Sequence, residues 1–168
     1  MRRRGRAPWS VFVMAVVFIF LLDQAVKFWS IRNLSFQESR PLIPGLVRLV
    51  HVENTGAAFS LLGNHRLFLL IVSAGALLVL ITALLRGWPR HPLGAWAMTS
   101  IAGGALGNFY DRAAQGHVTD MFEFEFVQFA IFNVADIFIT TGGVLLCVYL
   151  LYFHETKEKT PDDVPQSL

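Results

Sequence analysis

Two aspartates, Asp120 and Asp136, are the residues of this sequence best suited to chemistry. Asp136 lies in an apolar run with no basic residue within a helical turn, and an ionisable group at membrane depth is a functional candidate by default. Asp120 precedes it by sixteen residues, so a returning segment can bring the carboxylates face to face. Two adjacent carboxylates share a proton. One can then take a proton from water while its protonated partner hydrogen-bonds a scissile carbonyl, which is aspartic-peptidase chemistry.

Other hydrolytic chemistries have weaker support in the residues. The five histidines show no His-Glu-x-x-His spacing and a single cysteine cannot form a thiolate cage, so we expect no metal and no cofactor. Ser73 and Ser100 lie inside apolar runs, at a different depth from His154, which argues against a serine–histidine pair. Cys147 is interpreted as a small packing residue, because nothing near it would activate a thiol.

Four long apolar runs must position these residues. Of the 168 residues, 54% are hydrophobic and 15% are charged, and the charges collect between the runs. The runs cover residues 9–29, 67–85, 92–110 and 131–153. Each is close to the ~20 residues that a helix needs to cross ~30 Å of hydrocarbon. We expect all four to be helical, because unpaired backbone groups cannot face lipid.

The basic residues predict how the chain is oriented. The first run is interpreted as a permanent span, because no small-x-small cleavage site follows it. With the N-terminus inside, eight Lys and Arg residues fall in the short inner segments and six in the outer ones. Both termini are therefore expected in the cytoplasm, with segments 30–66 and 111–130 outside. We expect residues 1–154 to form a single domain and the charged, proline-containing tail 155–168 to be disordered.

The two outer segments do not read as plain loops. Within residues 121–129, three phenylalanines alternate with Glu123 and Glu125, which predicts a half-buried strand or an interfacial ribbon with an aromatic face toward lipid. Residues 42–53 are rich in Val and Leu and predict another short strand. Together they indicate a small β-rich platform on the outer membrane surface.

Small and polar residues form a stripe on each of the last two runs. The stripes consist of Ser100, Gly104, Gly107, Asn108 and Asp111 in the third run and of Asn133, Asp136, Thr140 and Gly143 in the fourth. At 100° per residue each set shares one helix face. Small residues let helices approach closely, so we interpret the glycines and Thr140 as packing residues.

Charged residues near the ends of two runs are interpreted as structural. Asp23 and Lys27 have i,i+4 spacing at the outer end of the first run, which favours an anchoring ion pair. Asp111 and Arg112 follow the third run, and we expect Arg112 to hold the adjoining loop.

Taken together, these segments resemble the lipoprotein signal peptidases, or type II signal peptidases, of bacteria. The matching motifs are Asp-Gln-Ala-Val-Lys at 23–27, Asn-Thr-Gly-Ala-Ala-Phe at 54–59, Gly-Gly-Ala-Leu-Gly-Asn-Phe-Tyr-Asp-Arg at 103–112, Val-Thr-Asp at 118–120 and Phe-Asn-Val-Ala-Asp at 132–136. They run through all four apolar runs in order. Met121 is a mild departure, because Phe more often follows the first aspartate.

The resemblance implies an intramembrane aspartic endopeptidase. It would remove signal peptides from prolipoproteins by cutting before a cysteine that carries diacylglycerol. The implied catalytic pair is Asp120 and Asp136. The implied surround is Asn54, Asn108, Asn133 and Ala135, with Asp23, Asp111 and Arg112 in support.

The resemblance also implies a fold and a location. We expect a bundle of four transmembrane helices in the bacterial cytoplasmic (inner) membrane, with a small extracytoplasmic β-sheet cradle and a short interfacial helix over the site. The expected partners are diacylglyceryl-modified prolipoproteins and membrane lipids, without nucleic acid, and the chain is expected to be a monomer.

Two other classes of function fit parts of the pattern. A small proton-coupled carrier would use Asp120 and Asp136 as a proton relay, although the chain has no internal repeat and four spans leave little material for alternating access. A scaffold subunit would use the polar stripes only to assemble helices.

Overall fold

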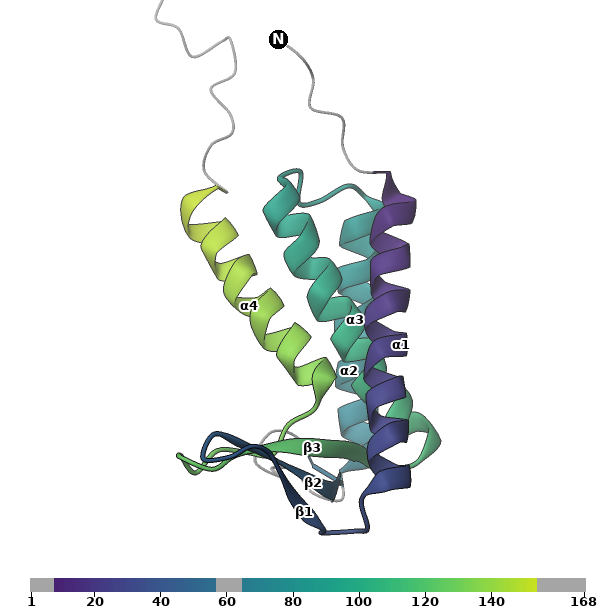
Figure 1. The fold of residues 1–168 in the computed structure, drawn as a ribbon. Helices are drawn as coiled ribbons and strands as arrows, with labels where there is room; N and C mark the ends of the chain where they lie inside the picture. The colour runs from purple at the N-terminus through teal and green to yellow at the C-terminus, as the bar shows by residue number, and fades with distance from the viewer. Residues whose placement is uncertain (1–7, 57–64, 154–168) are drawn as a thin grey trace, which may run out of the picture.

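Four helices form a bundle in which α3 takes the central position. The computed structural model describes residues 8–56 and 65–153. The helices are α1 (Trp9–Asn33), α2 (Arg66–Leu85), α3 (Pro92–Ala114) and α4 (Val134–Tyr152). Helix α3 packs against each of the other three, as Figure 1 shows. The predicted helical runs are confirmed, with ends that differ by no more than four residues from those expected.

Composition separates α3 from its neighbours. Helices α1, α2 and α4 are long and apolar enough to cross a membrane. Helix α3 is 23 residues long but carries many small and polar residues, and most of these are buried, among them Thr99, Asn108 and Asp111. Its surface faces the other helices, so it needs fewer large apolar side chains than a helix that faces lipid.

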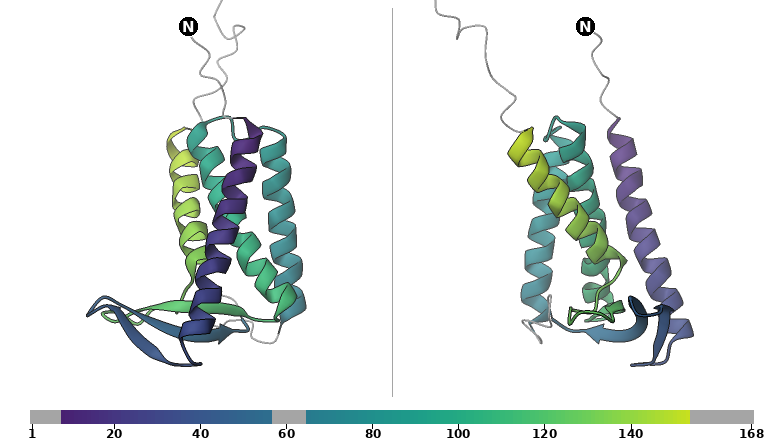
Figure 2. Two further views of the ribbon diagram at one scale, coloured as in Figure 1. Left: turned by 45° about the vertical axis from the view of Figure 1, so that its right-hand side comes forward. Right: turned by 60° about the vertical axis from the view of Figure 1, so that its left-hand side comes forward.

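A three-stranded antiparallel sheet lies across one end of the bundle. Its strands are β1 (Ser39–Ile43), β2 (Val47–Asn54) and β3 (Val118–Phe124), in the order β1-β2-β3. The sheet lies at the opposite end of the bundle from the beginning of α1 and the end of α4 (Figures 1 and 2). The register places Asp120 of β3 opposite Val52 of β2.

The expected strand over residues 42–53 is wrong in its extent, because a tight turn divides it. Leu46 N–H donates to Ile43 O at 2.9 Å, and Gly45 has φ +76°. Pro44 and Gly45 are the residue types that a turn with a left-handed third position requires. The segment therefore forms a hairpin of β1 and β2.

The alternating segment 121–129 is only partly a strand. Strand β3 begins earlier, at Val118, and ends at Phe124, so residues 125–129 lie outside it. Phe124 contacts Phe129 and Phe132 with ring centroids 5.8 and 5.1 Å apart. The aromatic side chains thus pack on one another next to the start of α4. The described residues contain no short interfacial helix, and the tail 155–168 lies outside them.

Glycines allow α3 to approach its neighbours closely, as predicted for two of them. A Cβ added at Gly104 would overlap the carbonyl oxygen of Ala135 on α4. One added at Gly107 would lie 2.5 Å from Asp23 Oδ2 on α1. No side chain larger than hydrogen fits either position without displacing a neighbour.

The packing prediction is wrong for Gly143 and Thr140. A Cβ on Gly143 would meet nothing within 4 Å, and Thr140 is exposed. Gly142 is the close contact instead, with Ala97 O at 2.7 Å from an added Cβ. The α4 face that meets α3 is therefore rotated by one residue from the predicted stripe.

Candidate active site

Asp120 is a buried carboxylate that receives two amide N–H groups. Its side chain is 2% exposed. Asn54 Nδ2, on the neighbouring strand β2, donates to Oδ2 at 2.9 Å, and Asn133 Nδ2 donates to Oδ1 at 2.7 Å. Burial, and to a lesser degree the nearby Asp136, outweigh the opposing effect of the two amides and raise the pKa of Asp120 to about 6. The group therefore takes up a proton far more readily than an ordinary aspartate.

Asp136 lies in the first turn of α4 and is part of its N-terminal cap. Asp136 N–H donates to Asn133 Oδ1 at 3.0 Å, while Asn133 N–H donates to Asp136 Oδ2 at 3.2 Å. This reciprocal pair is a capping box, which explains why α4 begins here. Asn108 Nδ2 of α3 donates to Asp136 Oδ1 at 2.8 Å. Asp136 is partly exposed, so this side of the site is open.

Asn133 connects the two carboxylates. Its amide nitrogen donates both to Asp120 Oδ1 and, at 3.1 Å, to Asn108 Oδ1, while its backbone binds Asp136. The structure therefore brings together Asp120 from β3, Asp136 from α4 with Asn133 at its N-cap, and Asn108 from α3. The site lies where the end of the sheet meets the bundle.

A second carboxylate pair, Asp23 and Asp111, lies behind the first and is bridged by Lys27. Lys27 Nζ is 2.7 Å from Asp23 Oδ2 and 2.7 Å from Asp111 Oδ2, and all three side chains are at most 3% exposed. The predicted Asp23–Lys27 ion pair is confirmed, with Asp111 as an additional partner. Asp23 Oδ1 also accepts the Ala135 N–H at 2.8 Å. This bond ties the start of α4 to α1.

Arg112 and Ala135 complete the predicted set. Arg112 Nη2 donates to Gly56 O at 2.7 Å, so this side chain holds the segment that follows β2 and not the loop next to it in the sequence. Ala135 is fully buried, with its Cβ facing Gly107. A larger side chain at 135 would press on α3 beside the two carboxylates.

Comparison with known proteins identifies the family. The family model described as signal peptidase (SPase) II matches residues 15–152. The chain belongs to the signal peptidase II family. It is 39% identical over 149 residues to the lipoprotein signal peptidase of Streptococcus pyogenes serotype M5 (strain Manfredo), an alignment that covers 83% of this chain and 92% of that protein.

Solved structures share the fold. One, described as a bacterial membrane enzyme determined by the in meso method at 2.3 Å resolution, superposes with a TM-score of 0.83 at 27% identity and covers 90% of this chain and 93% of that one. A second, described likewise at 1.9 Å resolution, gives a TM-score of 0.78 at 27% identity, with 86% and 94% covered. These matches show a membrane-embedded peptidase of the signal peptidase II family.

Two residues of this signal peptidase II, Gln24 and Arg66, form hydrogen bonds to residues of the site and were not predicted from the sequence. Gln24 Nε2 donates to Asp111 Oδ1 at 2.8 Å, across the α1–α3 contact. Arg66, the first residue of α2, donates to the carbonyl oxygens of Arg112 and Ala113, both at 2.8 Å. Gln24 lies inside an apolar run, which is a usable signal, whereas nothing in the sequence distinguishes Arg66 from other loop arginines.

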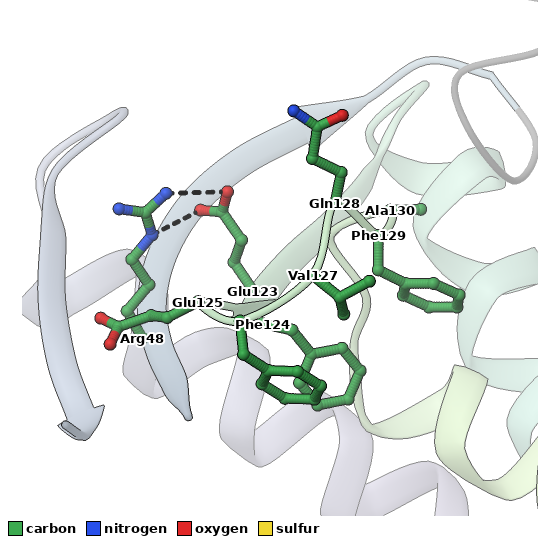
Figure 3. Close-up of a pocket in the computed structure, with 9 residues that line it drawn as sticks. Arg48, Glu123, Phe124, Glu125, Val127, Gln128, Phe129 and Ala130 are labelled. Atoms are coloured by element: carbon green, nitrogen blue, oxygen red, sulfur yellow. Dashed lines mark hydrogen bonds and ion pairs between the residues drawn. The ribbon is translucent and has the colours of Figure 1, made fainter. Parts of the chain in front are cut away.

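A hollow of the peptidase lies away from the aspartates, beside the C-terminal end of β3. It has a volume of about 670 Å³ and is lined by Arg48, Glu123, Phe124, Glu125, Phe126, Val127, Gln128, Phe129 and Ala130 (Figure 3). Arg48 of β2 and Glu123 of β3 form a bidentate ion pair in which both hydrogen bonds are 2.9 Å long. Charged side chains thus border the hollow on one side and aromatic rings on the other.

Proposed function

We propose that this chain cleaves prolipoproteins just before their diacylglyceryl-modified cysteine, with Asp120 and Asp136 as the catalytic pair. Its family membership makes it a signal peptidase II, and this sets aside the carrier and scaffold hypotheses. The observation that supports the assignment of the residues is the bridge from Asn133 to both carboxylates. The bridge holds them as neighbours at the partly open start of α4.

The two carboxylates differ in a way that divides the work between them. Asp136 accepts two N–H groups at the N-terminal end of α4, and the end of a helix with free N–H groups stabilises negative charge. Asp120 is buried, and its pKa of about 6 favours the protonated form. Asp136 is therefore the proposed base and Asp120 the proposed acid.

Hydrolysis then proceeds without a nucleophilic side chain. Asp136 takes a proton from a water molecule while the oxygen of that water bonds to the scissile carbonyl carbon. At the same time Asp120 donates its proton to the carbonyl oxygen. The resulting tetrahedral diol collapses when the carbon–nitrogen bond breaks. The amine leaves with the proton held by Asp136, and one hydroxyl of the diol returns its proton to Asp120.

The remaining predicted residues have supporting roles in this proposal. Asn54, Asn108 and Asn133 donate to the carboxylates. Asp23 and Asp111 hold α1, α3 and α4 together around Lys27, and Ala135 supplies the N–H that joins α4 to Asp23. Arg112 fixes the segment after β2, beside the dyad.

For the location we propose four spans in the bacterial inner membrane. Helix α3 is long enough to cross, at 1.5 Å per residue over 23 residues, and is surrounded by helices that face lipid. The beginning of α1 and the end of α4 lie at one end of the bundle, which fits cytoplasmic termini and an extracytoplasmic sheet (Figure 2). We propose that residues 1–154 act as one domain and as a monomer in contact with lipid.

Cysteine labelling of intact cells tests the orientation. In a Cys147→Ala background, Arg40→Cys on β1 should react with an impermeant reagent and Glu158→Cys should not. Labelling at 158 with none at 40 would invert the topology and place the aspartates on the cytoplasmic side.

The function is tested with purified protein in detergent. It should cut a synthetic precursor that carries diacylglycerol on its cysteine, at the bond before that cysteine, and leave the same peptide without lipid largely intact. Cutting elsewhere, or equal cutting of both peptides, would contradict the proposed substrate.

A further inference from the structure

Lys27 is a buried ammonium group with three oxygen atoms close to its Nζ. It is 3% exposed, and among the described residues no other lysine or arginine is buried. Its Nζ forms ion pairs with Asp23 Oδ2 and Asp111 Oδ2, each at 2.7 Å, and donates a hydrogen bond to Asn108 Oδ1 at 3.1 Å. An ammonium donates and never accepts. Lys27 therefore dictates which atom of Asn108 faces it.

An asparagine amide can present either its oxygen or its NH2 to a neighbour. Because Lys27 requires the oxygen, the NH2 of Asn108 points the other way, to Asp136 Oδ1 at 2.8 Å. Asn133 Nδ2 also donates to the Asn108 oxygen, at 3.1 Å, and reinforces this orientation. If the amide rotated by half a turn, its oxygen would face the carboxylate of Asp136 and repel the ionised form.

The geometry points to a role for Lys27 beyond that of an anchor. We propose that Lys27 is a positioning residue of the peptidase, which fixes the Asn108 amide so that its NH2 stabilises the ionised carboxylate of Asp136. The inference rests on the proposed function of Asp136 as the base. Lys27 contacts neither carboxylate of the dyad, so its effect passes through Asn108.

Lys27 lies in a cluster of charged side chains, most of them carboxylates. Asp23 on α1 and Asp111 on α3 form ion pairs with it, and Asp120 on β3 interacts with it electrostatically. Arg112 on α3 interacts in turn with Asp111, Asp120 and Asp136. Removing Lys27 alone would leave two buried carboxylates facing each other and endanger folding. The double variant Lys27→Met/Asp111→Asn avoids this, because it retains the net charge of the cluster while losing the N–H toward Asn108.

The reference for this double variant is Asp111→Asn, in which Lys27 and its bond to Asn108 remain. Relative to it, the double variant should lose about 10- to 100-fold in kcat, with little change in KM, as expected of a small misplacement near the reacting atoms. The pH–rate profile of the double variant should also change, because Asp136 has lost the N–H that Asn108 donates. Arg40→Gln, which removes an exposed cation of β1, should change neither kcat nor profile.

A double-mutant cycle separates positioning from general damage. When Asn108→Ala is added to both proteins, the loss of Lys27 should have almost no further effect on kcat, since the amide it orients is gone. An equal fold-loss with and without Asn108 would overturn the proposal. So would an unchanged kcat and profile in the double variant.

A second variant keeps the proposal testable if Lys27→Met/Asp111→Asn does not fold. Asn108→Asp retains an acceptor for Lys27 but has no NH2 for Asp136, so it should fold and yet lose kcat as Asn108→Ala does. Near-normal turnover of Asn108→Asp would contradict the inference. Asp136→Asn is measured alongside, and if this variant stays active the proposed function fails. If it is inactive but the loss of Lys27 lowers kcat equally with and without Asn108, only the role of Lys27 is refuted.

Discussion

The molecule contains two pairs of aspartates within one hydrogen-bonded network, and the two pairs are stabilised differently. Asp23 and Asp111 share the ammonium group of Lys27. Asp120 and Asp136 receive N–H groups from neutral amides, and in residues 8–56 and 65–153 neither forms an ion pair. A cation between two carboxylates offsets their charge and holds them together, whereas neutral donors leave a proton to be shared between the carboxylates. The first pair therefore suits structure and the second suits proton transfer.

Neutralising Asp120 or Asp136 should have the largest effect on turnover. Asp120→Asn and Asp136→Asn each remove one half of the proton relay, so turnover should fall by at least about 10³-fold while the fold is retained. The measurement is cleavage of a lipidated precursor by purified variants. Glu123→Gln, on the same strand as Asp120 but paired with Arg48, is the control and should keep turnover. A dyad variant with near-normal turnover would refute the aspartic mechanism.

Neutralising a member of the first pair should affect stability more than chemistry. Asp23→Asn leaves Lys27 with one carboxylate in a buried site, and breaking a buried ion pair costs about 3 kcal/mol. The amide retains an oxygen for the Ala135 N–H, so kcat should fall by less than about tenfold. Thermal unfolding and turnover of the same preparation measure both effects. Glu38→Gln, in an exposed ion pair with Arg40, is the control; a stable but inactive Asp23→Asn would erase the distinction between the pairs.

The raised pKa of Asp120 also predicts how the stability of the fold depends on pH. The pKa of Asp120 is about 6 in the folded protein and about 3.9 in an unfolded chain, so between these values the folded state binds more protons. Stability should therefore fall as the pH rises from 4 to 6 and then level off, by on the order of 2 kcal/mol. Asp120→Asn should flatten this decline, which thermal unfolding at pH 4, 5, 6 and 7 will show. An equally steep decline in the variant would mean that another group is responsible.

Much of this architecture was predictable, for physical reasons. The four helices follow from runs of about 20 apolar residues, and a carboxylate in such a run pointed to Asp136. The hairpin of β1 and β2 was missed although Pro44 and Gly45 specify its turn. Alternation suggested a strand to residue 129, but aromatic packing around Phe132 takes the chain out of the sheet after Phe124.

Two features of the site depend on tertiary structure and have no local signal. Asp111 and Lys27 are 84 residues apart, so their ion pair depends on how α1 packs on α3. The rotation of α4 by one residue, which replaces Gly143 with Gly142 in the contact, depends on the same packing. A periodic pattern predicts that a helix has a small face, but it does not determine which neighbour covers it.

The smallest expected effect distinguishes glycines that differ only in their surroundings. An alanine Cβ at position 107 would press on Asp23 Oδ2, which Lys27 holds in place, and overpacking costs about 1–3 kcal/mol against the ~1 kcal/mol gained in helix propensity. At Gly143 only the gain applies, because an added Cβ meets nothing. Gly107→Ala should therefore lower the unfolding temperature and Gly143→Ala should raise it or leave it unchanged. If both variants changed the unfolding temperature in the same direction, Asp23 would be able to move aside for an added Cβ at position 107.

The central claim, that Asp120 and Asp136 work by sharing a proton, is tested most directly by a pH–rate profile of the purified protein with a metal chelator present. Turnover requires one protonated and one ionised carboxylate, so kcat/KM should follow a bell. The alkaline limb should fall near pH 6, where Asp120 loses its proton in the free enzyme. Substitution of either aspartate should remove the activity that defines both limbs. Loss of activity on chelation, restored by zinc, or a rate that keeps rising to pH 9, would contradict the account.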